Sequence, residues 1–215
     1  MVGPPFSAHA TAYRREHSTT EEHKYVRSLT ARNLPIPSMH FLTDAECREW
    51  LQQEDIDAVD SRGFPEVVGD YEVFFAAPKE ARAQQMLARE MVEWVGEFDA
   101  ALLWLSDWPA YRPEEMAIAL ALRRAHGEER HLIDAPGHLF TWQEKDELVG
   151  WIALLICFGW DGFLFASPFK GSMFQTSHED FLWATAASAE CFAVAKQFPR
   201  RHGLEIYRET QARNS

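Results

Sequence analysis

An apolar run over residues 149–158, closed by Gly159, constrains the fold more than any other feature of this chain. The residues from Glu144 onward are first amphipathic at helical spacing and then apolar on every side. A helix that is apolar all round must be buried, so residues 144–158 predict a central core helix that ends at Gly159. The run is only about half the length that crosses a membrane.

Three compact motifs surround this helix, at residues 134–140, 158–165 and 176–181. Each places one or two titratable side chains among apolar or aromatic residues, next to a Gly, Pro or Ser that favours a turn. The same composition is typical of the edge of a core and of a small site. No catalytic signature in the sequence decides between the two.

Further elements follow from capping signals and periodicity. Thr43 and Glu46 form a capping box that starts a helix reaching about Gln53, and Pro78 and Pro113 open two more helices. Ser177 is expected to cap a last helix whose inner face includes Phe181 and Phe192. Strands are expected at residues 67–75, 100–105, 163–166 and 173–176, the last two joined as a hairpin. The order strand, helix, strand over 67–105 predicts one crossover connection.

These elements predict a single α+β domain in which a small mixed sheet of about four strands is covered by about five helices. Residues 1–38 are polar and rich in alternating charge, and we expect a loosely ordered or partner-bound arm. The globular domain is expected at residues 39–198, and residues 199–215 are expected to form a charged tail.

The formal net charge of −12 argues against nucleic acid and anionic membranes as partners, because phosphate binding needs clustered Lys and Arg. A protein partner with a basic surface is favoured instead. The three cysteines are far apart and include no CxxC pair, which favours a reducing cytoplasm. Neither GxGxxG nor a P-loop is present, so no cofactor is expected.

Asp161 and His178 are the pair of titratable residues that most deserves a structural test. If residues 163–166 and 173–176 pair as a hairpin, these two side chains meet at its open end. They would serve either general acid–base chemistry or a structural hydrogen bond, and we favour the structural role. The catalytic alternative adds His138, which is otherwise expected to satisfy a backbone group in a tight turn.

A metal site is the other chemical alternative, with His131, Asp134 and His138 on one loop and residues 178–180 on another. Zinc needs three or four converging ligands. The sequence holds no HExxH, and nothing in it shows that the two loops meet. We therefore expect no metal.

Aromatic residues supply the candidate binding surface. Trp104, Trp108 and Tyr111 crowd the end of the strand at 100–105, and Trp160 lies in the second motif. Exposed tryptophan and tyrosine often anchor a partner, although the same rings could form a lid over the core.

Residues 135–138 (APGH), 158–161 (FGWD) and 177–180 (SHED) together resemble a pattern of an uncharacterised family of bacterial proteins, in which APGH, an apolar helix, FGWD and SHDE follow one another. The last motif has its two acids in the opposite order. The resemblance covers about a third of the chain. It implies that these positions belong to one folded unit, and it carries no established activity.

The sequence as a whole favours a non-catalytic cytoplasmic protein that binds another protein. An immunity-type or defence-associated accessory role fits its acidic, Trp-rich composition by analogy. The alternative is a small hydrolase or nucleotide-processing enzyme that uses His138, Asp161 and His178, with or without a metal.

Overall fold

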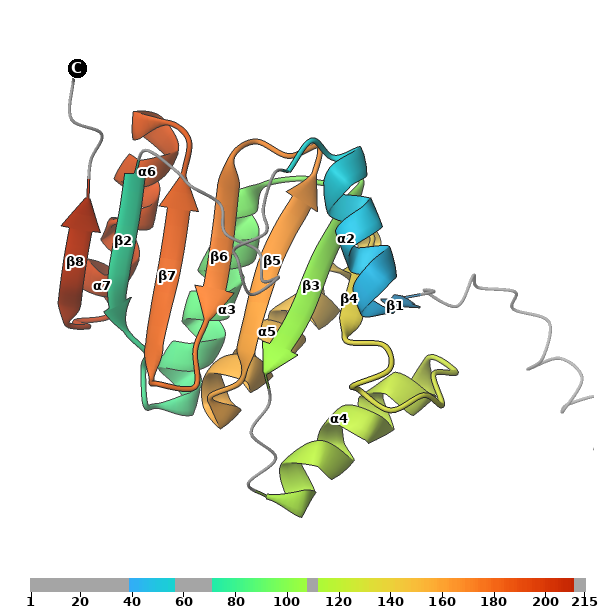
Figure 1. Cartoon of the computed structure of the whole chain (residues 1–215). Helices are drawn as coiled ribbons and strands as arrows, with labels where there is room; N and C mark the ends of the chain where they lie inside the picture. The colour runs from blue at the N-terminus through green and yellow to red at the C-terminus, as the bar shows by residue number, and fades with distance from the viewer. Residues whose placement is uncertain (1–38, 57–70, 108–111, 211–215) are drawn as a thin grey trace, which may run out of the picture. The chain divides into compact units, whose positions relative to one another are not determined.

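The computed structural model describes residues 39–56, 71–107 and 112–210 (Figure 1). The predicted arm at 1–38, part of the predicted strand at 67–75, and Trp108 and Tyr111 lie outside these ranges. The elements in chain order are β1 His40–Leu42, α2 Asp44–Gln53, β2 Tyr71–Ala76, α3 Ala81–Val95, β3 Ala100–Asp107, α4 Pro113–Ala125, β4 Gly137–Phe140, η1 Trp142–Glu144, α5 Lys145–Phe158, β5 Asp161–Ser167, β6 Ser172–Thr176, β7 Phe181–Ala186, α6 Ala189–Ala195, α7 Gln197–Arg201 and β8 Ile206–Thr210.

Within the described residues, the strands form one eight-stranded sheet in the order β1-β4-β3-β5-β6-β7-β2-β8. Every neighbouring pair is antiparallel. The mixed helix-and-sheet class is confirmed, but the predicted sheet of about four strands was too small and its mixed pairing was wrong. Of the four missed strands, β1 and β4 span only three and four residues, too short for alternation to stand out.

The predicted crossover from β2 through α3 to β3 is present, with a wider reach than expected. β2 and β3 point the same way in Figure 1, yet β5, β6 and β7 lie between them. The α3 connection therefore spans the width of three strands. These strands, β5, β6 and β7, come later in the chain and form a meander between β3 and β2. This order explains how the sheet is antiparallel throughout although it contains a crossover.

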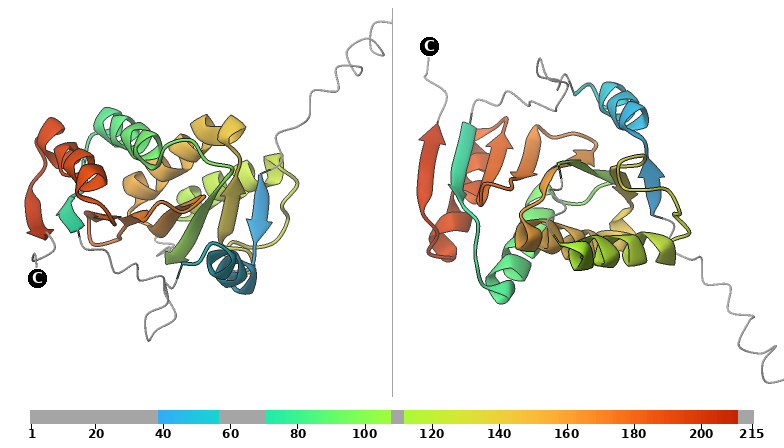
Figure 2. Two further views of the ribbon diagram at one scale, coloured as in Figure 1. Left: turned by 90° about the horizontal axis from the view of Figure 1, so that it is seen from above. Right: turned by 60° about the horizontal axis from the view of Figure 1, so that its bottom comes forward.

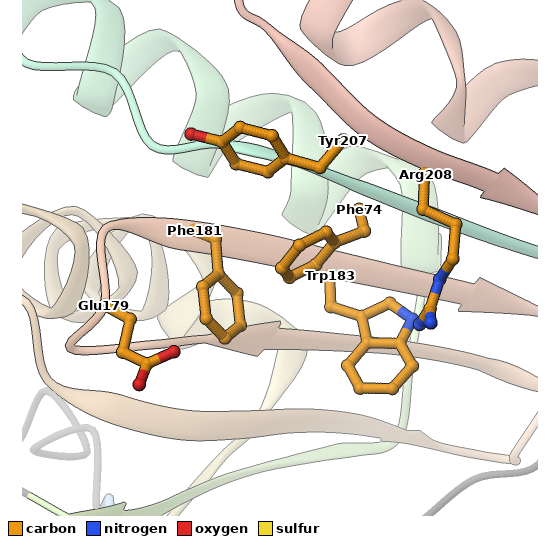
Figure 3. Close-up of a pocket in the computed structure, with 6 residues that line it drawn as sticks. All are labelled: Phe74, Glu179, Phe181, Trp183, Tyr207 and Arg208. Carbon is orange, nitrogen blue, oxygen red and sulfur yellow. The ribbon is translucent and has the colours of Figure 1, made fainter.

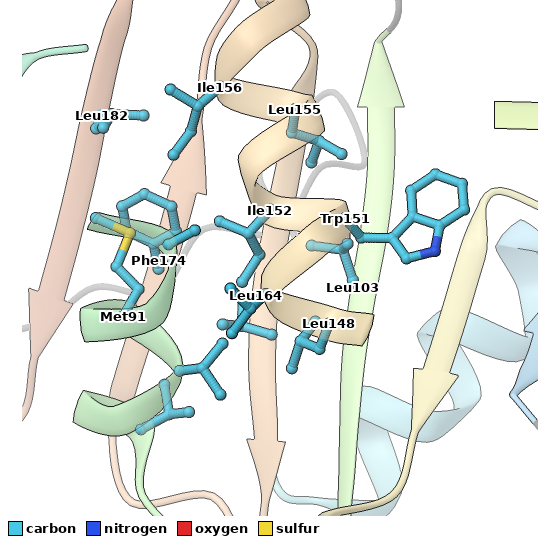
Figure 4. Close-up of a cluster of buried hydrophobic side chains, with 14 of the residues drawn as sticks. Met91, Leu103, Leu148, Trp151, Ile152, Leu155, Ile156, Leu164, Phe174 and Leu182 are labelled. Atoms are coloured by element: carbon cyan, nitrogen blue, oxygen red, sulfur yellow. The ribbon is translucent and has the colours of Figure 1, made fainter. Parts of the chain in front are cut away.

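Helices α3, α5, α6 and α7 cover one face of the sheet, and α2 lies on the other (Figure 2). Figure 4 shows α5 against β3, β5 and α3, with Leu148, Ile152 and Leu155 buried in the contact. Each such side chain contributes about 1.5–3 kcal/mol by leaving water. The predicted central helix is confirmed, and Gly159 ends it with a φ of 63°, a left-handed conformation that glycine adopts without strain.

β3 is buried on both faces, which explains its unbroken apolar run. Leu103 and Leu105 face α3 and α5, whereas Leu102 and Trp104 face α2. On that second face, Cys47 and Leu51 of α2 complete a smaller core. The capping box at Thr43 is present as predicted and sets where α2 begins.

The helix predicted after Ser177 is wrong. Residues 181–186 form β7, whose alternate side chains are buried, and the helix begins only at Ala189 with Ser188 as its cap. The Ser177 hydroxyl instead accepts a hydrogen bond from the Glu179 backbone N–H within a turn. Leu182 and Ala184 point into the core because β7 pairs with both β6 and β2, a non-local cause that capping signals cannot reveal.

The predicted charged tail from residue 199 also needs correction. Pro199 belongs to α7, and residues 206–210 form β8, which pairs with β2. An ion pair between Arg200 and Glu209, 3.0 Å apart, links α7 to β8. The strand is polar because it lies at the sheet edge, where charges discourage pairing with other chains. Within the described ranges, none of the helices has the length and apolar character that a membrane crossing requires.

Candidate functional site

Three polar residues lie together where β3 ends, β5 begins and the turn after β6 starts. Asp107 stands opposite Asp161 because the β3–β5 register shifts between Leu105 and Asp107. The pairing of Gly162 with Thr176 brings the turn residue His178 next to Asp161. The predicted hairpin geometry is therefore confirmed for Asp161 and His178, and Asp107 is an addition that the sequence did not reveal.

The three side chains form a small cluster in which Asp161 and His178 are hydrogen-bonded and Asp107 lies nearby. His178 Nδ1 lies 3.0 Å from each carboxylate oxygen of Asp161, and the His178 backbone N–H also donates to Oδ1. One donor atom from each of Asp107, Asp161 and His178 can be chosen such that all lie within 4.8 Å of one another. The His178 side chain is 42% exposed and that of Asp161 is 18% exposed, so the cluster is open to solvent.

The protonation equilibria of this cluster depend on burial and charge. Burial raises the pKa of Asp161, although its hydrogen bonds from His178 act in the opposite direction. The pKa of His178 is raised chiefly by its hydrogen bond to Asp161 and also by the negative charges of Asp161 and Asp107. The imidazolium form of His178 is thereby favoured beside the two acids.

His138 does not join this cluster. It is fully buried, with Nδ1 3.0 Å from the Pro136 carbonyl oxygen and Nε2 3.1 Å from Arg123 Nη1. Its ring packs against Phe41 and Trp151. The catalytic set of His138, Asp161 and His178 is therefore not assembled. His138 lies on β4 and is hydrogen-bonded to the backbone carbonyl of Pro136 just before the strand, not within the tight turn that was predicted.

The loop residues considered as metal ligands are also apart from the cluster. His131 and Asp134 are exposed, and the only group of metal-ligating residues found in the described part of the chain is Asp107, Asp161 and His178. Asp180 forms an ion pair with Lys79. The loop at 131–138 and the turn at 178–180 thus do not form the shared site that was considered from the sequence.

Two of the four predicted binding aromatics are core residues. Trp104 and Trp160 are each 1% exposed, so neither ring is available to a partner. Trp104 lies under α2, where its Nε1 donates to Asp44 Oδ1 at 3.1 Å. Burial of these rings corrects the prediction for Trp104 and Trp160, while Trp108 and Tyr111 lie outside the described residues.

A different aromatic surface lies on β2, β7 and β8. The β2–β7 register places Phe74 opposite Trp183, and the β2–β8 register places Arg208 beside Phe74. Their side chains line a pocket of about 490 Å³, shown in Figure 3. Its complete lining, called here the aromatic surface, is Phe74, Glu179, Phe181, Trp183, Tyr207 and Arg208.

The side chains of the aromatic surface are held by one another. The Phe74 and Phe181 rings are 4.4 Å apart, and the guanidinium carbon of Arg208 lies 5.4 Å from the Trp183 ring. A bulge in the β2–β8 pairing directs Tyr207 toward Phe74, with ring centroids 5.4 Å apart. Residues 181–184 are apolar throughout, so the sequence itself did not mark which of these side chains face solvent.

No protein-family model matches the chain. No curated protein and no solved structure matches it either. The resemblance drawn from the three sequence motifs therefore stays an expectation.

Proposed function

We propose that this protein is a non-catalytic protein-binding module whose aromatic surface holds an apolar side chain of a basic partner protein. The observation that supports this proposal is the placement of the surface on the sheet. Trp183, Phe74 and Arg208 lie side by side across three strands, on the sheet face that also carries α2. Among the described helices, none packs on these three strands from that side, as Figures 1 and 2 show.

The composition of the aromatic surface suits protein recognition. Trp, Tyr and Arg are the residue types enriched at the energetic centres of interfaces. Tyr207 is 52% exposed, so a large ring is already presented to solvent. Stacking of Arg208 on the Phe74 and Trp183 rings holds these side chains in place before a partner arrives, which reduces the entropy lost on binding.

Charge indicates the kind of partner. The chain carries a formal net charge of −12, and Glu179 lies at the edge of the aromatic surface. Long-range attraction therefore favours a basic partner and speeds its encounter with this protein. We assign the apolar contact to the pocket and the complementary charge to Glu179 and to the net negative charge of the chain.

Site-specific photo-crosslinking in cells of the source organism tests this function. The photoreactive amino acid p-benzoylphenylalanine replaces Tyr207 in one variant and Ile133, which is 74% exposed on the loop before β4, in a matched control. We expect a crosslink to a basic protein from position 207 only. Crosslinks to the same proteins from both positions, or only to a second copy of this chain, contradict the proposal.

A second variant measures the contribution of the pocket once the partner is captured. Trp183→Ala is expected to weaken binding of the purified partner at least about 30-fold, because truncating an interface centre costs about 2 kcal/mol or more. Ile133→Ala serves as the control and should bind as the wild type does. Equal affinity of the Trp183→Ala protein would remove the pocket from the interface.

A further inference from the structure

We propose that Asp107, Asp161 and His178 form a binding site for a divalent transition-metal ion of the zinc type. One imidazole and two carboxylates supply the nitrogen and oxygen ligands that such ions accept in proteins. The site is distinct from the aromatic surface and goes beyond the proposed protein-binding function. Three protein ligands leave room for water or another ligand to complete the coordination of the ion.

The spacing of the donor atoms fits this assignment. Zinc bonds to imidazole nitrogen and carboxylate oxygen measure about 2.0–2.2 Å, which places neighbouring ligand atoms of a tetrahedral site roughly 3.3–3.6 Å apart. His178 Nδ1 is 3.0 Å from the Asp161 carboxylate oxygens. The Asp107 donor lies within 4.8 Å of the other two, a separation that rotation of its exposed side chain can shorten.

The backbone brings two like charges together at this point. A shift in the β3–β5 register leaves Ser106 without a partner and sets Asp107 directly opposite Asp161. Like charges in directly opposite positions of a sheet destabilise it, and Asp107 and Asp161 are two such carboxylates. A divalent cation would offset both, and bulges of this kind frequently re-aim side chains at functional sites.

The ligands are also oriented by their surroundings, as metal ligands commonly are. The His178 backbone N–H donates to Asp161 Oδ1 and so orients that carboxylate. Of the two other acids on the turn, Asp180 is engaged by Lys79 and Glu179 lines the aromatic surface, so neither is counted among the ligands. The partly exposed His178 ring leaves the cluster accessible to an ion from solvent.

Calorimetric titration of Zn²⁺ into chelator-treated full-length protein tests the site. We expect one ion to bind per chain, and Asp107→Asn and His178→Gln each to weaken the affinity at least about tenfold. Asp134→Asn removes an exposed acid from a different loop and should leave the affinity unchanged. Mg²⁺ should bind far more weakly, because it prefers an all-oxygen shell that retains several waters.

Three results would overturn the metal site. They are absence of Zn²⁺ binding at 100-fold excess over protein, equal affinity of the wild type and the Asp107→Asn protein, and equal loss in the Asp134→Asn control. Asp107 is exposed, so its variant is expected to fold, and circular dichroism verifies this. Loss of the Co²⁺ absorption bands in the His178→Gln protein adds a spectroscopic readout of direct ligation.

Discussion

The buried guanidinium of Arg123 selects the tautomer of His138. Arg123 Nη1 lies 3.1 Å from His138 Nε2, and because arginine can only donate, Nε2 must be the acceptor. The proton of the neutral ring therefore resides on Nδ1, which donates to the Pro136 carbonyl. Burial, together with the charge of Arg123, lowers the pKa of His138 to about 3.

This pair makes stability depend on pH in a defined window. An unfolded histidine has a pKa of about 6.5, so between pH 3 and 6.5 the unfolded chain binds one proton more at residue 138 than the folded chain does. The contribution of His138 to the free energy of unfolding should therefore fall by about 1.4 kcal/mol per pH unit as the pH drops through this window, and His138 should contribute no slope above it. Urea unfolding of wild type and His138→Gln at pH 4.5 to 6.0 measures the difference in slope, and parallel curves would contradict it.

Gly137 allows α2 to approach β4 closely. A Cβ atom at this position would overlap Cys47 Sγ and lie 2.9 Å from Leu42 Cβ. Gly137→Ala should lower the free energy of unfolding by about 1–3 kcal/mol, because the close-packed core must shift. Gly150→Ala is the matched control, since a Cβ there meets no atom within 4 Å, and it should be neutral or stabilise α5 by up to about 1 kcal/mol. Equal effects of the two changes would show that the α2–β4 contact is loose.

The two kinds of tryptophan should differ in their effect on stability. Trp104 is 1% exposed, and Trp104→Ala should cost about 3–5 kcal/mol because it leaves a cavity under α2. Trp183 belongs to the aromatic surface and is only partly buried, so Trp183→Ala should cost about 1 kcal/mol. Urea unfolding of both variants measures the contrast. A larger loss for Trp183 than for Trp104 would place Trp183 in the structural core.

Residues 204–210 should be required for full stability. Removing the chain after Gly203 deletes β8, its pairing with β2 and the Arg200–Glu209 ion pair. We expect the free energy of unfolding to fall by about 2–4 kcal/mol, given about 1 kcal/mol for each lost backbone hydrogen bond. Glu209→Gln removes only a partly exposed ion pair and should cost about 1 kcal/mol or less. A thermal unfolding midpoint that is unchanged by the truncation would show that β8 contributes nothing to stability and behaves as the charged tail that was predicted.

Local signals in the sequence predicted several elements well. The capping box at Thr43, the proline at residue 113 and the glycine at residue 159 mark where α2 and α4 begin and where α5 ends. These signals work because hydrogen bonds at a helix end involve residues within a turn of one another. The β5–β6 hairpin was equally local, and from it the meeting of Asp161 and His178 followed.

Other parts depended on partners far away in the chain. Residues 181–186 show no apolar–polar alternation, and the capping signal at Ser177 favoured a helix there. Only pairing with β6 and β2 makes this segment a strand. The polar residues 206–210 join the sheet because β2 pairs with β7 on only one side, which leaves its other edge available for pairing with β8. Asp107 faces Asp161 only because of a register shift between β3 and β5.

The amino-acid sequence by itself determined the α+β class, the buried central helix and the contact of Asp161 with His178, since each follows from residues close together in the chain. Tertiary structure alone decided the eight-stranded order, the burial of Trp104 and the exposure of Tyr207. The physical reason is that periodicity and capping report local backbone preference. Which strand lies beside which, and so which ring faces water, is decided by the free energy of packing the whole chain.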